Sequence, residues 1–197
     1  MKKKIILGVL ALLALVCLLS SVYTVEENQY ACTVRFSKII HTTQTPGLHF
    51  KVPFLDSVKY FPKAMMLYDI PPSEVLTSDK QNMTVDNYIL WRVSDPLLFY
   101  QSLGSTVVAE ERLNALTYNT LKTVMGTLSQ ADIINMDDAS ERNEIYAGIA
   151  SSVNALAQNY GIEVVDVKIK RFDLPEANEN AVYARMISER NQIAEKY

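Results

Sequence analysis

The sequence predicts an α+β protein, in which a single N-terminal transmembrane helix precedes two small strand-containing parts and the start of a long C-terminal helix. Three observations carry this prediction. An uncharged, largely apolar run occupies residues 5–22. Segments with alternating apolar and polar residues, typical of strands, dominate residues 23–94. From residue 95 onward, segments with apolar residues every three or four positions, typical of helices, mix with one further strand.

The apolar run is long enough to be a membrane anchor. Its roughly 18 residues would form a helix of about 27 Å, close to the thickness of the hydrocarbon layer of a bilayer. Lys2, Lys3 and Lys4 precede it, and the positive-inside rule places such a cluster in the cytoplasm. We therefore expect a single-pass protein of the plasma or inner membrane, with residues 23–197 on the extracytoplasmic side. A cleaved signal peptide and a helix lying on the membrane surface are the alternatives.

Composition excludes several classes of protein. The 197 residues include 19 basic and 22 acidic ones, a net charge of −3, so no polybasic surface indicates a nucleic acid as partner. The aromatic share of 9% and the charged share of 21% are those of a folded chain rather than a disordered one. Cys17 lies inside the apolar run and Cys32 just beyond it, so we expect no disulfide framework.

Strands are expected in the first half of the chain. The alternation predicts a strand over residues 30–36, an extended segment over residues 58–70 that is closed by two prolines, and a hairpin formed by residues 75–77 and 82–93. In the second arm of the hairpin the apolar side chains share one face, which includes Ile89, Trp91 and Val93. Trp91 is expected in the core, with a place in an interface as the alternative. Pro46-Gly47 indicates a turn.

Helices are expected in the second half. Asp95 can cap a short helix that starts at Pro96, and Ser105 can cap a longer one that runs to about Met125. Asp138 and Glu141 resemble a capping box for a third helix, which ends near Gly161. The predicted apolar stripes consist of Ala109, Leu113, Leu116, Thr120 and Val124 in the longer helix and of Ile145, Ile149, Val153, Leu156 and Tyr160 in the third. A strand over residues 162–172 follows, with Val165, Val167 and Ile169 on one face.

Four segments, in this order, resemble motifs of the SPFH (band 7) family, which includes stomatin, prohibitin, flotillin, HflK and HflC. They are residues 46–54 (PGLHFKVPF), 85–95 (VDNYILWRVSD), 161–170 (GIEVVDVKIK), and 182–186 (VYARM) with Glu189-Arg190. The second and third segments favour the HflC-like branch over stomatin. The resemblance covers residues 25–197 and so includes almost all of the chain outside the apolar run.

The resemblance implies an anchor at residues 1–22, a sheet-rich SPFH subdomain near the membrane at 23–94, a mixed β/α subdomain at 95–174, and the truncated start of a coiled-coil helix at 175–197. It further implies a non-enzymatic scaffold that contacts the lipid bilayer, joins an HflK-like protein in a hetero-oligomeric ring or cage, and modulates an FtsH-like membrane protease. A generic stomatin-like organiser of membrane domains, without a protease partner, is the alternative.

The residues themselves offer no catalytic, metal or cofactor site. Nucleophilic catalysis needs a serine or cysteine with a base in reach, and the only histidines are His41 and His49. Cys32 is close to His41 in sequence but lacks a third, orienting group, and we interpret it as a residue of a strand core. We therefore expect no enzyme. A membrane-anchored hydrolase and a binding module secreted after signal cleavage are the remaining hypotheses.

Two sets of residues are candidates for contact sites. Because apolar side chains crowd the segment after Pro46-Gly47, near the anchor, we expect either membrane contact or core packing for Leu48, His49, Phe50, Phe54 and Leu55. The resemblance implies that the last helix is an assembly seam, with candidate residues Val182, Met186, Glu189, Arg190 and Ile193.

Overall fold

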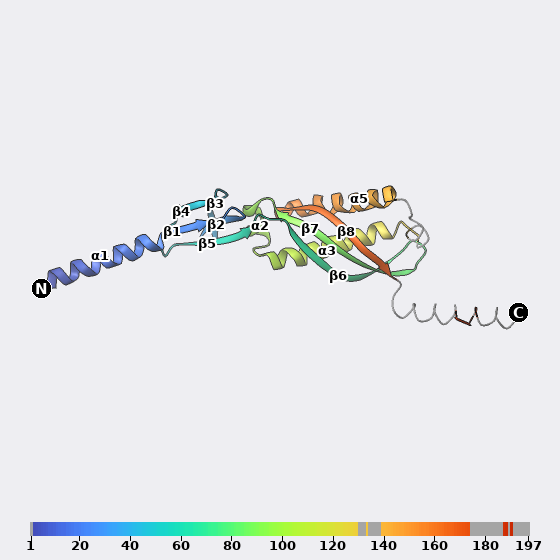
Figure 1. The fold of residues 1–197 in the computed structure, drawn as a ribbon, viewed down its shortest axis with the longest axis horizontal. Coiled ribbons are helices and arrows are strands. Elements are labelled where there is room, and N and C mark those ends of the chain that lie inside the picture. Colours follow the sequence, from blue (N-terminus) through green and yellow to red (C-terminus); the bar gives the residue numbers. More distant parts are fainter. Residues whose placement is uncertain (1, 130–132, 134–138, 174–186, 189, 191–197) are drawn as a thin grey trace. The chain divides into compact units, whose positions relative to one another are not determined.

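The computed structural model describes residues 2–129, 133, 139–173, 187, 188 and 190, which fall into two compact units (Figure 1). Unit 1 contains the described residues up to 66, together with 92–108 and 158–163. Unit 2 contains those of 67–91, 109–157 and 164 onward. Both units combine helices and strands, which confirms the expected α+β class.

Unit 1 begins with helix α1 (Lys2–Ser20), followed by strand β1 (Val22–Val25). The sequence predicted an uncharged helix that extends to Val22. The helix ends at Ser20 instead, because Val22 enters a strand that pairs with β4 (Gly47–Phe50). The uncharged part of α1 is therefore about 24 Å long, and no helix in the described part of the chain is long and apolar enough to cross a membrane. The predicted helix is present as α1, two residues shorter at its C-terminal end than expected.

A three-stranded antiparallel sheet in the order β3–β2–β5 forms the centre of unit 1. Its strands are β2 (Gln29–Arg35), β3 (Lys38–Thr43) and β5 (Asp56–Pro62). The predicted strand at residues 30–36 is confirmed, except that Phe36 lies in the two-residue turn to β3. Phe36 and Ser37 have φ angles of 47° and 65°, and positive φ at both positions matches the twist of a hairpin with so short a loop.

The two faces of this sheet are covered by different elements. On one face Tyr23 and Val25 of β1 pack with Ala31 in a buried cluster. On the other face lies helix α2 (Pro96–Ser102), where the ring of Phe99 is 5.2 Å from the ring of Phe61. The β3–β2–β5 sheet is therefore the middle layer of unit 1.

Helix α2 starts as the sequence predicted. The Asp95 carboxylate accepts hydrogen bonds from the backbone N–H groups of Leu97 and Leu98 at 2.9 and 3.1 Å, and Pro96 is the first helical residue. Gly161 has a φ of +71° and fits tightly against this helix. A Cβ atom there would meet the carbonyl oxygen of Asp95 and lie 2.7 Å from the backbone nitrogen of Phe99.

Unit 2 contains a sheet in the order β6–β7–β8, with helices α3 and α5 beside it (Figure 1). The strands are β6 (Met66–Leu76), β7 (Asn82–Val93) and β8 (Ile162–Asp173), and a short 3-10 helix, η1 (Gln158–Tyr160), precedes β8. The predicted hairpin is confirmed, and so is the apolar face of β7, on which Trp91 is fully buried in the core.

Helices α3 (Thr106–Met125) and α5 (Ala139–Ala157) lie where the sequence predicted helices. The Ser105 hydroxyl accepts a hydrogen bond from the Val108 N–H at 3.4 Å, as expected of a cap. The buried stripe of α3 shifts by one residue after Leu113, because Thr117, Leu121 and Met125 are buried where Leu116, Thr120 and Val124 were expected. In α5, Ala157 is buried where Leu156 was expected. Asp138 of the predicted capping box lies outside the described residues.

Both outer strands of the unit 2 sheet have irregular edges. β6 continues through Pro71-Pro72, where the sequence predicted its end, because an outer strand tolerates residues that lack an N–H. In β8 the N–H of Val164 donates to the Asn154 side chain and that of Val167 to the Asp166 carboxylate, both at 2.9 Å. The alternation of β8 changes phase between these positions, so Val165 is exposed instead of sharing the buried face.

Candidate functional site

An exposed apolar surface lies at β4 and the turn that follows it. We call this surface the apolar edge, and it consists of Leu48, Phe50, Phe54 and Leu55. Leu48, Phe50 and Phe54 are 68%, 79% and 83% exposed, and about half of Leu55 is exposed. Exposure on this scale contradicts core packing, the alternative considered from the sequence, for all four residues.

His49 differs from its neighbours because successive side chains of a strand point to opposite faces. Its ring lies 5.7 Å from the ring of Tyr23, the residue it opposes on β1. Its Nε2 atom is 2.9 Å from the carbonyl oxygen of Thr45. His49 is therefore half-buried and held by the protein, while Leu48 and Phe50 project away from it.

Two backbone-linked contacts fix the apolar edge beside the end of α1. The Ser21 hydroxyl donates a hydrogen bond to the carbonyl oxygen of Lys51 at 2.6 Å. The Lys51 N–H donates to the carbonyl oxygen of Ser21 at 2.7 Å. Because Ser21 directly follows α1, the end of this helix and the end of β4 are joined.

Asp56 organises the turn that carries Phe54. Its carboxylate accepts the Val52 N–H at 2.9 Å and two hydrogen bonds from Arg35, at 2.6 and 3.0 Å. The Arg35 guanidinium holds the pKa of the Asp56 carboxyl below its usual value. Within this turn Phe54 has a φ of 67°, in the left-handed region that bulky residues rarely occupy and that costs about 1–2 kcal/mol. A strained backbone thus holds a large apolar side chain in solvent.

Helix α1 extends the exposed apolar surface. Its leucines occur on all sides of the helix, and seven are more than half exposed: Leu7, Leu10, Leu12, Leu13, Leu15, Leu18 and Leu19. A helix that is apolar all round is normally covered, either by the rest of a protein or by lipid.

Cys32 and His41, the candidate nucleophile and base, do not contact each other. Cys32 is fully buried and opposes Thr42 across the β2–β3 pair, whereas His41 opposes Thr33, the neighbour of Cys32. The side chains of Cys32 and His41 therefore lie on opposite faces of the sheet. Burial raises the pKa of the Cys32 thiol, which disfavours the reactive thiolate. Among the described residues no cluster of His, Cys, Asp or Glu could hold a metal ion.

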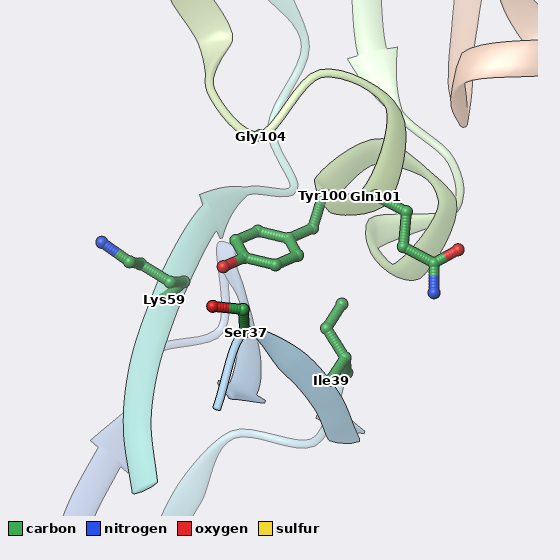
Figure 2. Close-up of a pocket in the computed structure, with 6 residues that line it drawn as sticks. All are labelled: Ser37, Ile39, Lys59, Tyr100, Gln101 and Gly104. Carbon is green, nitrogen blue, oxygen red and sulfur yellow. The ribbon is translucent and has the colours of Figure 1, made fainter. Parts of the chain in front are cut away.

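A polar cleft of about 530 Å³ opens on the α2 face of the sheet, and no pattern in the sequence indicates it. Figure 2 shows the Tyr100 ring above Ser37 of the β2–β3 turn, with its hydroxyl at the end that faces Ser37 and Lys59 of β5. The other lining residues are Ile39, Gln101 and Gly104. None of these six described residues is a histidine, cysteine or carboxylate, so the cleft offers Ser37 neither an imidazole nor a carboxylate as a base.

The candidate assembly residues of the last helix are scarcely covered by the structure. Val182, Met186, Glu189 and Ile193 lie outside the described residues. Arg190 is described as a helical, exposed residue. The role of this helix as an assembly seam therefore stays a prediction.

Comparison with known proteins gives a consistent result. The SPFH domain / Band 7 family matches residues 23–197. The chain is similar to the modulator of FtsH protease HflC of Escherichia coli (strain K12), with 29% identity over an alignment of 240 positions that covers 100% of this chain and 71% of that protein. It is similar to protein HflC of Buchnera aphidicola subsp. Schizaphis graminum, with 31% identity over 97% of this chain and 68% of that protein. It is also similar to protein HflC of Haemophilus influenzae, with 30% identity over 90% of this chain and 63% of that protein.

Proposed function

This chain belongs to the SPFH domain / Band 7 family and is HflC-like, and from this membership we propose that it is a membrane-attached, non-enzymatic scaffold that modulates an FtsH-type protease. The name of the Escherichia coli relative, a modulator of FtsH protease, supports the protease as partner. An HflK-like protein, as the second component of a hetero-oligomeric ring or cage, completes the proposal.

The apolar edge is the observation that carries membrane attachment. Burying a phenylalanine or leucine side chain contributes a free energy of about 1.5–3 kcal/mol. Leu48, Phe50 and Phe54 are mostly exposed, so folding of this chain gains little of that free energy from them. A lipid surface would cover these side chains together with α1, whose end is joined to β4 through Ser21 and Lys51. The apolar edge and α1 therefore both favour contact with lipid.

A scaffold is supported over an enzyme by the chemistry of the described residues. Cys32 is buried with a raised thiol pKa, and it lies on the face of the sheet opposite to His41. The cleft that contains Ser37 is lined by no histidine and no carboxylate. The groups that a hydrolase needs are present as residue types but are not brought together.

Membrane contact is tested by moving a fluorescent side chain along the surface. Phe54→Trp is placed in the full chain, which is reconstituted into vesicles that contain brominated lipid. The native Trp91 is fully buried and gives a constant background. Leu67→Trp is the matched control, because Leu67 on β6 of unit 2 is 62% exposed. We expect strong quenching at position 54 and little at position 67. Equal quenching at both positions would contradict contact through the apolar edge.

The protease partnership is tested by purifying the chain from its native membranes in mild detergent and identifying its partners by mass spectrometry. We expect an FtsH-like protease and an HflK-like protein. Recovery of the protease alone would remove the second component from the proposal. Attachment to the membrane without recovery of the protease would favour the stomatin-like organiser instead.

A further inference from the structure

A second cleft in unit 1, of about 500 Å³, lies next to the apolar edge. It opens on the β1 face of the β3–β2–β5 sheet, opposite the cleft of Figure 2, because its lining includes Tyr23 of β1 and Thr33 of β2. Ile40, Phe50 and Val52 supply apolar wall. Phe50 is also part of the apolar edge, so the cleft and that edge form one continuous surface.

The inner part of the cleft is polar and already ordered. The Tyr23 hydroxyl lies 3.4 Å from the Thr33 hydroxyl and 3.2 Å from the Thr43 hydroxyl, and all three residues are buried. These hydroxyls hold one another in place. The cleft therefore combines a preformed polar floor with an apolar wall, as a site for an amphipathic molecule requires.

The charge at the mouth of the cleft is unbalanced. The Asp56 carboxylate lines the cleft but is occupied by the two hydrogen bonds from Arg35. Lys51 also lines the cleft, and its backbone is fixed through Ser21. Its ammonium group forms no ion pair with any described residue, although its charge contributes to the lowered pKa of the Asp56 carboxyl. His41 is a further basic side chain in the lining. Arg35 and Lys51 together carry two positive charges against the one negative charge of Asp56, and the excess favours an anion.

From these observations we propose that this cleft binds the phosphate-bearing headgroup of a single anionic phospholipid. Lys51 and His41 contact the phosphate, and the acyl chains leave along Phe50 toward the apolar edge. The inference rests on the proposed membrane attachment and adds a specific lipid site to it. It accounts for an amphipathic cleft, an unpaired ammonium group and an exposed aromatic side chain with one ligand.

The test measures which lipid stays bound to the full chain. The chain is reconstituted into bilayers with equal amounts of phosphatidylglycerol and phosphatidylcholine, extracted in mild detergent, and analysed by native mass spectrometry. Lys51→Met removes the charge and keeps the apolar stem and the backbone contacts. The control is Lys59→Met, because Lys59 is an exposed lysine of the same sheet that lines the opposite cleft.

We expect the unmodified chain to retain phosphatidylglycerol in preference to phosphatidylcholine. Lys51→Met should lower this preference about five-fold, the effect of one lysine near an anionic headgroup, and Lys59→Met should leave it unchanged. No preference in the unmodified chain, or the same loss in both variants, would overturn the lipid site.

Two further measurements separate the possible sources of failure. Calorimetric titration of the full chain with glycerol phosphate distinguishes a lipid from a free phosphate compound, and binding as tight as that of the lipid would overturn the lipid as ligand. Flotation with vesicles reports attachment independently of the cleft. A chain that does not float refutes the proposed function itself, whereas a chain that floats without lipid preference refutes only this inference.

Discussion

Replacing Phe54 with glycine changes stability and membrane affinity in different ways, and both effects can be worked out from the structure. The residue has a φ of 67° and is 83% exposed. Glycine removes left-handed strain worth about 1–2 kcal/mol. It also adds flexibility to the unfolded chain, at a cost of about 0.5–1 kcal/mol, and loses the small buried part of the ring. We expect a free energy of unfolding within about 1 kcal/mol of the unmodified chain.

The membrane affinity should respond much more strongly. Roughly four-fifths of the ring remains to be buried, so contact with lipid should add about 1.2–2.4 kcal/mol out of the about 1.5–3 kcal/mol for a whole phenylalanine. Phe54→Gly should therefore lower the partition coefficient into vesicles about 8- to 60-fold.

Urea unfolding and a lipid titration of the full chain measure the two quantities. Leu67→Ala is the control, since it removes an exposed apolar side chain of unit 2 and should leave partitioning unchanged. The reasoning is refuted by a loss of about 3–5 kcal/mol in unfolding free energy, the usual cost of truncating a core phenylalanine, or by unchanged partitioning.

Three more changes test the local structure. Gly161→Ala should lower the unfolding free energy by about 3 kcal/mol or more in urea unfolding, because the new Cβ meets the Asp95 carbonyl and the φ of +71° is strained; a loss below about 1 kcal/mol would contradict this packing. Since the pKa of Asp56 is lowered by Arg35, its contribution to stability is present above the pKa of an unfolded aspartate, about 4, and is lost as the pH falls through the lower folded pKa. Asp56→Asn should therefore destabilise the chain at pH 7 but much less at pH 2, and equal losses at both would count against the pair. Phe36→Asn should raise the thermal midpoint, because asparagine tolerates the φ of 47° and the ring is 82% exposed; a lowered midpoint would show that the ring packs within the chain.

Local signals predicted the ends of several elements correctly. Asp95 followed by Pro96 gave the start of α2, and Gly161 gave the turn before β8, because caps and positive-φ positions depend on the few residues around them. The same local reasoning was wrong for Phe36. An apolar residue continues an alternating pattern, but a two-residue hairpin turn at that position overrides it.

The buried stripes of α3 and α5 could not be predicted to the residue. In α3 the sequence pattern selected Leu116, Thr120 and Val124, whereas the structure buries their neighbours Thr117, Leu121 and Met125. In α5 the structure buries Ala157 instead of Leu156. Both helices lie beside a sheet, and sequence periodicity alone carries no information on which of two adjacent helix positions the sheet covers. The strain at Phe54 was equally invisible, because it arises from Asp56 and Arg35 holding the turn together.

The irregular edges of the unit 2 sheet protect this chain against the addition of strands from other copies. A foreign strand can add to a sheet only where the outer strand still offers N–H groups, and unchecked addition leads to amyloid-like fibres. On β6, Pro71 and Pro72 have no N–H to offer, and on β8 those of Val164 and Val167 are already taken by side chains. Many copies held side by side would thus be guarded against polymerising through these strands, even at the high local concentration of an assembly.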